Sequence, residues 1–160
     1  MKLQNFSQND PRWKNVKIGD STETLGESGC FVTSICNLNA YFAVLASDIV
    51  IPPVLAVMPG LFTAEGNIII EKLDMKLFKF DYRVDGFSPA RIDDGIKDPR
   101  KGVILRVRNN YWDKNLHHFV LALSKIPFTN IYKILDPWDG KIKFSTAYGI
   151  IDGSRHFISK

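Results

Sequence analysis

The stretch TLGESGCFVTSICNLNAYF, residues 24–42, is the part of the sequence that decides the fold. A turn containing glycine leads into an apolar run whose side chains recur at the spacing of one helix face, namely Phe31, Val32, Ile35, Cys36, Leu38 and Phe42. So broad an apolar face predicts a helix over residues 29–43 that is buried in the middle of the domain, with Ser28 as its N-cap.

Cys30 would stand in the first turn of this helix. There the positive end of the helix dipole and the unpaired backbone N–H groups lower the pKa of a thiol, which raises the fraction present as thiolate. The same N–H groups can hold the oxyanion of an acyl-transfer reaction. Gly29, which has no side chain, would let a substrate backbone come close. Cys30 is therefore a candidate nucleophile.

Other roles are open to a cysteine at this position. A disulfide between Cys30 and Cys36 inside one helix is rejected, because their Cα atoms would lie about 9 Å apart and disulfides tolerate about 7 Å. No C-x-x-C or H-x-x-x-H pair is present, so the sequence predicts neither a metal site nor a cofactor. A small buried thiol stays open for Cys30, and it is the interpretation of Cys36, which lies on the apolar face.

The sequence changes character after this helix. Helical segments are predicted around residues 52–58 and near 67–74. The second half carries strand-like runs separated by turn signals, GVILRVR (102–108), HFVLALS (118–124), NIYKILD (130–136), KIKFS (141–145) and RHFIS (155–159). Helices followed by an antiparallel sheet predict the α+β class. The lack of a repeat or linker predicts a single domain over residues 1–160.

Two polar residues in strand settings could complete a nucleophilic site. His118 opens one strand and Asp136 closes the next, so neighbouring antiparallel strands can bring them side by side. With Cys30 they would supply the nucleophile, the base and the group that orients the base. Asp139 and Asp152 are the alternatives to Asp136.

The adjacent histidines leave a choice between two bases. By strand alternation His118 shares a face with Val120 and Ala122, whereas His117 shares one with larger side chains. A helix that crosses closely over the sheet prefers the face with small side chains, which favours His118. His117 remains the alternative, and His156 comes too late in the chain to be the first choice.

Composition and charge restrict the partners. The formal net charge of +4 over 160 residues weakly favours an anionic partner such as a cell-wall polymer. No Lys/Arg-rich block or RNA-type aromatic motif points to nucleic acid. The N-terminal MKLQNFSQNDPRW lacks the apolar core of a signal peptide, which predicts synthesis in the cytoplasm. Charged residues and prolines interrupt the longest apolar stretch, so no membrane insertion is expected.

Several short motifs occur in the order found in a known family. They are QNDPRW (8–13), LGESGC (25–30), PPVLAVM (52–58), GLFTAEGNIIIEKL (60–73), HFVLALS (118–124) and ILDPWDG (134–140). In their order and spacing the chain resembles the papain-like cysteine peptidases of the bacteriocin-processing-peptidase-like group, in the stand-alone form common in bacteria and their phages.

The resemblance implies a papain-like fold in which the nucleophile helix packs on an antiparallel sheet. It implies Cys30 as nucleophile, His118 as general base and acid, and Asp136 as the residue that orients the imidazole. The family usually has a glutamine upstream of the cysteine as an oxyanion donor. Thr24 stands six residues before Cys30, and the matching glutamine is Gln8, for which a turn or capping role stays open.

The expected function is a cysteine peptidase or amide hydrolase that cleaves peptidoglycan peptides as a phage or bacterial lytic endopeptidase. It would act at the cell wall or in a virion, and a holin partner or carriage in the virion would bring it there. Two alternatives stay open. One is a related amidase or transglutaminase-like thiol enzyme, and the other is a catalytically inactive papain-like binding module or virion structural component.

Overall fold

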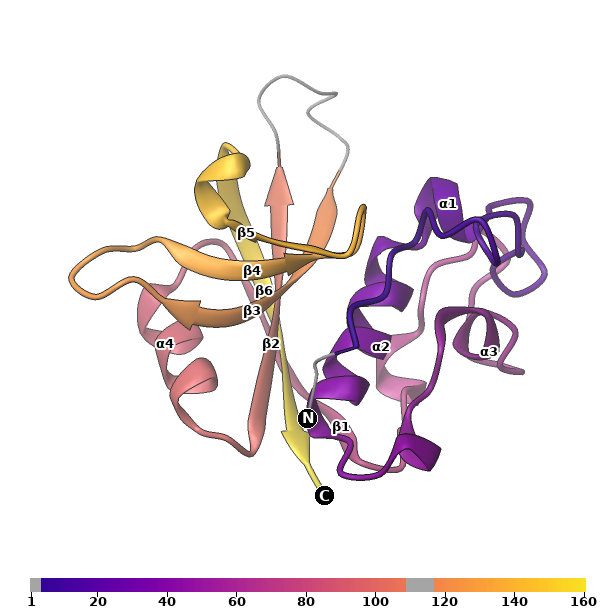
Figure 1. The fold of residues 1–160 in the computed structure, drawn as a ribbon, viewed down its shortest axis with the longest axis horizontal. Coiled ribbons are helices and arrows are strands. Elements are labelled where there is room, and N and C mark those ends of the chain that lie inside the picture. Colours follow the sequence, from indigo (N-terminus) through magenta and orange to yellow (C-terminus); the bar gives the residue numbers. More distant parts are fainter. Residues whose placement is uncertain (1–3, 109–116) are drawn as a thin grey trace.

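The chain folds into a six-stranded sheet with helices on both of its faces. In the computed structural model, which describes residues 4–108 and 117–160, the strand order is β1-β6-β2-β3-β4-β5, and neighbouring strands pair in the antiparallel sense. Figure 1 shows α1, α2 and α3 on one side of the sheet and α4 on the other. The predicted α+β class with an antiparallel sheet is therefore confirmed.

The bounds of the elements follow the sequence patterns closely in most cases. The helices are α1 (Leu25–Ser28), α2 (Cys30–Phe42), α3 (Pro52–Ala56) and α4 (Pro89–Lys97), with short 3₁₀ turns at η1 (Ala46–Asp48), η2 (Ile70–Lys72) and η3 (Ser145–Ala147). The strands are β1 (Phe78–Asp85), β2 (Lys101–Arg108), β3 (His118–Lys125), β4 (Tyr132–Asp136), β5 (Lys141–Phe144) and β6 (Ile150–Ser159). No helix within the described ranges is long and apolar enough to cross a bilayer.

The sheet buries side chains on both of its faces, because successive residues of a strand point to opposite sides. On one side Leu105 and Ile134 form a cluster with Ile92 of α4. On the other side Ile104 and Leu121 belong to the larger core that also contains the apolar face of α2. The central strand β2 is consequently buried along most of its length.

Helix α2 begins directly after Gly29, which is its N-cap. Ser28, expected in that role, is instead the last residue of α1, and its hydroxyl donates to Glu23 Oε2 at 2.5 Å. Thr24 caps α1 through a capping box. The expected N-cap was wrong because the LGES segment forms its own helical turn, which leaves only Gly29 between the two helices.

The joint between α1 and α2 has no room for a side chain. A Cβ at position 29 would lie 2.3 Å from the carbonyl oxygen of Leu25, far closer than van der Waals contact. This requirement of the backbone explains the glycine without any role for a substrate, and it fixes where the first turn of α2 begins.

The N-terminal segment, residues 6–9, joins α2 to the far end of the sheet. The Phe6 N–H donates to Asn37 Oδ1 at 2.7 Å, and the buried Asn37 amide donates back to the Phe6 carbonyl at 3.2 Å. Two residues later the Gln8 N–H donates to the carbonyl of Pro137, in the turn after β4, at 2.7 Å. The start of the chain therefore holds the central helix and the β4–β5 turn in one arrangement.

Three parts of the fold differ from the expectations. Strand β1 and helix α4 were not predicted, although FKFDYRVD shows the period-two alternation of an edge strand. Helix α4 buries only Ile92 and Gly95, so its apolar signal is weak. The helix expected near 67–74 is only the 3₁₀ turn Ile70–Lys72.

Replacing Gly29 by alanine tests the α1–α2 joint. We expect Gly29→Ala to lower the free energy of unfolding by roughly 1–3 kcal/mol, because the added methyl group must displace backbone. Urea denaturation followed by circular dichroism measures it. Ser28→Ala, which adds no atom at the joint, serves as the control and should cost about 0.5 kcal/mol or less. Equal stability of Gly29→Ala and wild type would contradict the steric explanation.

Candidate active site

A cleft of about 590 Å³ lies between the start of α2 and the sheet. Its lining includes Cys30 and Phe31 from α2 and His118 and Phe119 from β3. Gln8 from the N-terminal segment also lines it, as does Trp138 from the β4–β5 turn. The cleft therefore collects the predicted nucleophile, the predicted base and the predicted oxyanion donor from three distant parts of the sequence.

The two cysteines have different surroundings, as the sequence indicated. Both are free thiols. Cys30 is the first residue of α2 and is partly exposed in the cleft. Cys36 is fully buried in the main core, and this burial raises the pKa of its thiol far above the usual range. Only Cys30 is placed where a substrate could reach it.

His118 and Asp136 meet through the pairing of β3 with β4. The register pairs Leu121 with Leu135 and Ala122 with Ile134, which places His118 and Asp136 on one face of the sheet, diagonally across the two strands. His118 Nε2 lies 2.8 Å from Asp136 Oδ1. Because Nε2 is engaged with the carboxylate, Nδ1 is the ring nitrogen left for a reaction partner.

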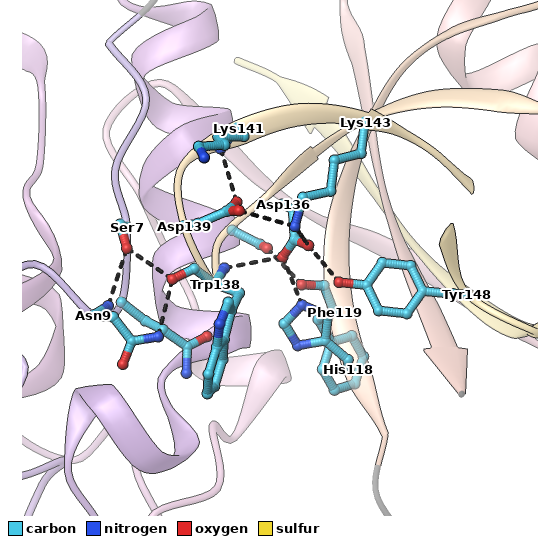
Figure 2. A network of polar contacts seen from close by, with 12 residues as sticks. Ser7, Asn9, His118, Phe119, Asp136, Trp138, Asp139, Lys141, Lys143 and Tyr148 are labelled. Carbon is cyan, nitrogen blue, oxygen red and sulfur yellow. Dashed lines mark hydrogen bonds and ion pairs between the residues drawn. The ribbon is translucent and has the colours of Figure 1, made fainter. Parts of the chain in front are cut away.

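Asp136 is fully buried and accepts hydrogen bonds from four donors (Figure 2). Its Oδ1 accepts from His118 and, at 2.9 Å, from the Trp138 N–H. Its Oδ2 accepts from Lys143 Nζ at 2.7 Å and from the Tyr148 hydroxyl. Burial by itself would raise the pKa of Asp136, but these donors hold it well below its usual range. The carboxylate therefore stays ionised.

The surroundings of His118 favour its protonated form. Burial lowers the pKa of His118, but the hydrogen bond to the Asp136 carboxylate and the neighbouring Cys30 thiol raise it to about 9. The ring also lies against that of Tyr148, with 5.4 Å between their centres. A histidine held as imidazolium beside a thiol can stabilise the thiolate and later donate a proton.

Helix α2 covers the opposite sheet face from the one expected. Phe31 of α2 stacks on Phe119 with ring centres 4.5 Å apart, and the Ser34 hydroxyl donates to the Phe119 carbonyl at 3.0 Å. The face with large side chains therefore packs under α2, since aromatic stacking outweighs the preference for small residues. His118 still meets Asp136, but because of the strand register and not because a small-residue face attracts the helix.

The other titratable residues considered as alternatives have partners of their own. His117 Nε2 lies 3.2 Å from Asp152 Oδ2, away from Asp136. Asp139 pairs with Lys143 at 3.0 Å. His156 is buried and stacked on Tyr82, and burial lowers its pKa to about 4. The geometry brings His118, and not His117, together with Asp136.

Gln8 is buried at the edge of the cleft. Its side-chain Nε2 donates to the Gly26 carbonyl at 3.0 Å, which uses one of its two hydrogens. Its Oε1 has no hydrogen-bond partner among the described residues, although it is buried. An amide with one hydrogen available and one oxygen unpaired is unusual in a protein interior and suits a group that meets a ligand.

Two residues that bind Asp136, Lys143 and Tyr148, were not predicted from the sequence. Lys143 stands opposite Ile134 in the β4–β5 pair, so a period-two pattern could have placed it on the same face as Asp136. Tyr148 follows the 3₁₀ turn Ser145–Ala147, where no periodicity holds. Among the described side chains, no group of three or more His, Cys, Asp or Glu gathers as metal ligands would.

The raised pKa of His118 predicts a pH-dependent stability. Its folded-state pKa of about 9 lies above the ordinary value of 6.5, so its contribution is complete below pH 6.5 and is lost as the pH rises towards 9. We expect the free energy of unfolding in urea to fall by on the order of 2–3 kcal/mol across this range. The fall should shrink in His118→Gln and persist in His117→Gln. An unchanged pH slope in His118→Gln would contradict the assignment.

The sequence was also compared with known proteins. No model of a protein family matches the chain, and no curated protein matches it. The chemistry of the site is therefore inferred from its geometry and from the order of the sequence motifs.

Proposed function

We propose that the protein is a papain-like cysteine peptidase or amide hydrolase with Cys30, His118 and Asp136 as its catalytic triad. The observation that carries the proposal is the Nε2–Oδ1 hydrogen bond of 2.8 Å between His118 and the buried Asp136, beside Cys30 in one cleft. This order of nucleophile, imidazole and buried carboxylate is the arrangement that activates a thiol for acyl transfer.

The first half of the reaction forms an acyl-enzyme. The Cys30 thiolate attacks the carbonyl carbon of the scissile amide, and the carbonyl π electrons move to oxygen. Backbone N–H groups at the start of α2 and the remaining hydrogen of Gln8 Nε2 support the oxyanion. His118 then gives its Nδ1 proton to the leaving nitrogen, the C–N bond breaks, and a thioester with a free amine remains.

The second half returns the enzyme to its starting state. Neutral His118 takes a proton from water at Nδ1, and the resulting hydroxide attacks the thioester carbonyl. The C–S bond breaks, the product leaves as a carboxylic acid, and Cys30 is restored as a thiolate beside the His118 imidazolium. Asp136 stays ionised throughout, because its four donors oppose protonation, and so it favours the imidazolium that each half-reaction needs.

Peptidoglycan peptides are the proposed substrate class, cut by a phage or bacterial lytic endopeptidase. The support is the resemblance in motif order and the formal net charge of +4, which suits a polyanionic wall. The cleft is also large enough for a few residues of an extended peptide. A catalytically inactive binding module would not need an imidazole held by a buried carboxylate beside a thiol, so this arrangement supports hydrolysis over that alternative.

Purified bacterial walls test the reaction directly. We expect wild type to release new free amino groups and carboxyl ends in equal amounts, and Cys30→Ala to release neither. Cys36→Ala is the matched control, because it removes a thiol of the core while leaving the cleft lining unchanged. Loss of activity in Cys36→Ala at unchanged fold, or equal release by Cys30→Ala and wild type, would contradict the mechanism.

The state of the thiol can be measured without a substrate. If His118 activates Cys30, the rate of alkylation by iodoacetamide stays high well below the ordinary half-reaction near about pH 8.5. In His118→Gln the profile should move to that ordinary value. A wild-type profile that already matches a free thiol would exclude the activated nucleophile, and would leave the inactive binding module as the better description.

Tyr148 is expected to act as a positioning residue through Asp136. Tyr148→Phe removes one donor from Oδ2 while Lys143 keeps its own, so Asp136 should remain ionised and the fold intact. We expect kcat to fall by about tenfold with KM nearly unchanged, because the imidazole is less firmly oriented. A change confined to thermal stability, with kcat and the alkylation profile as in wild type, would show that Tyr148 is only structural.

A further inference from the structure

The face of the sheet that borders the cleft carries a row of arginines, Arg83, Arg155 and Arg106, of which Arg106 lines the cleft. Cross-strand pairing places Arg106 opposite Phe119, and places Arg155 opposite both Ile104 and Arg83. Directly paired residues share a face, and so do residues two apart in one strand. The three arginines therefore lie on the same face as Phe119, which stacks on Phe31 of α2 and lines the cleft.

Positive charge exceeds negative charge in this row. The single carboxylate of Asp152 is shared by Arg106 Nε at 2.8 Å, Arg108 Nε at 2.8 Å and His117 Nε2 at 3.2 Å. Arg155 is buried, and the carboxylate of Asp85 approaches it only to 4.0 Å. Burial and then the neighbouring charge of Arg106 lower the pKa of Arg155.

The excess charge is partly shielded from water. Among the described residues, the guanidinium groups of Arg106, Arg108 and Arg155 face the carboxylate of Asp152, which leaves a formal excess of two positive charges. Arg83 and Asp85 are both largely exposed and pair with each other at 3.7 Å. Partly buried cations repel one another more strongly than exposed ones, because solvent screens them less. Such a wall is stabilised by an anion that enters the cleft.

Arg106 is the member of the row that lines the cleft together with Cys30 and His118. Its guanidinium is held on one side, since Nε donates to Asp152 Oδ1 at 2.8 Å and Nη2 donates to the Asp152 carbonyl at 3.0 Å. Gly153 lies directly beneath it, where a Cβ would come within 3.3 Å of Nε. Arg106 is thus pre-oriented, so binding an anion costs little side-chain entropy.

We propose that Arg106, backed by Arg108 and Arg155, binds a carboxylate of the peptide substrate beside Cys30. This deepens the proposed function and rests on it, since it assigns that site to peptides with an acidic group near the scissile bond. A planar guanidinium with a fixed orientation matches a carboxylate in shape and charge. The imidazolium of His118 lies in the same cleft and adds to the attraction.

Two alkylating agents of equal chemistry and different charge test the proposal. Iodoacetate carries a carboxylate and iodoacetamide does not. The measured quantity is the rate of Cys30 alkylation by iodoacetate divided by the rate with iodoacetamide. This ratio is normalised to the same ratio for free cysteine at equal pH and salt, and it then reports the attraction of an anion into the cleft. Cys36 is buried and does not compete. We expect the ratio to fall by about three- to tenfold in Arg106→Gln, as removal of one nearby, partly buried charge implies.

Arg83→Gln is the matched control. It removes one positive charge from the same sheet face, but at an exposed position in β1. The ratio should stay within about twofold of wild type in this variant. An equal fall in both variants, or no fall in Arg106→Gln, overturns the proposal. Arg106→Lys, which keeps the charge but cannot hold both Asp152 contacts, gives a second measurement if Arg106→Gln folds poorly.

The test separates failure of this proposal from failure of the proposed function. Cys30 is partly exposed, so even an unactivated thiol reacts with both agents and yields a ratio. The iodoacetamide pH profile alone reports activation, whereas the ratio alone reports carboxylate binding. An ordinary profile with an Arg106-dependent ratio would leave the anion site standing without the peptidase.

The position of the carboxylate in the substrate can be resolved with isomeric competitors. N-acetylglutamic acid α-amide carries its charge on the side chain, N-acetylglutamine carries it at the C-terminus, and N-acetylglutamine amide is neutral. Stronger protection of Cys30 from iodoacetate by one charged isomer than by the neutral amide identifies the source. Equal protection by all three compounds contradicts a carboxylate site.

Discussion

One buried carboxylate organises the sheet side of the site. A charge without solvent contact is costly unless donors surround it, and Asp136 meets four of them. Those donors come from β3, from the turn after β4, from β5 and from the residue after the 3₁₀ turn Ser145–Ala147. The need to satisfy a single side chain therefore determines where four separate segments of the second half of the chain must lie, and the orientation of His118 follows from it.

The adjacent histidines at the start of β3 bind different carboxylates. His118 Nε2 lies 2.8 Å from Asp136 Oδ1, whereas His117, which precedes the strand, has its Nε2 3.2 Å from Asp152 Oδ2. Each histidine is thereby tied to its own carboxylate and its own basic partner, Lys143 in one case and Arg106 in the other. The two networks come together at the start of β3, where both histidines line the cleft.

Local patterns were enough to predict the central helix, most strands and the meeting of His118 with Asp136. These follow from helical spacing, strand alternation and the turn signals between adjacent strands, which act over a few residues. The prediction of which sheet face α2 covers was wrong, because that face depends on how Phe31 and Phe119 stack once the helix and the strand are in place. The contact of Tyr148 with Asp136 was not predicted for a related reason. Tyr148 follows a 3₁₀ turn, and no sequence periodicity predicts the path of the backbone there.

The attachment of the N-terminal segment to the β4–β5 turn has a consequence for how the molecule is made. Ser7 binds the carbonyl of Trp138, a partner 131 residues further along the chain. On the ribosome, Gln8 and Cys30 emerge long before the turn whose Pro137 carbonyl accepts from the Gln8 N–H. The cleft is consequently completed only after this turn has been synthesised, and a shorter nascent chain carries an incomplete site.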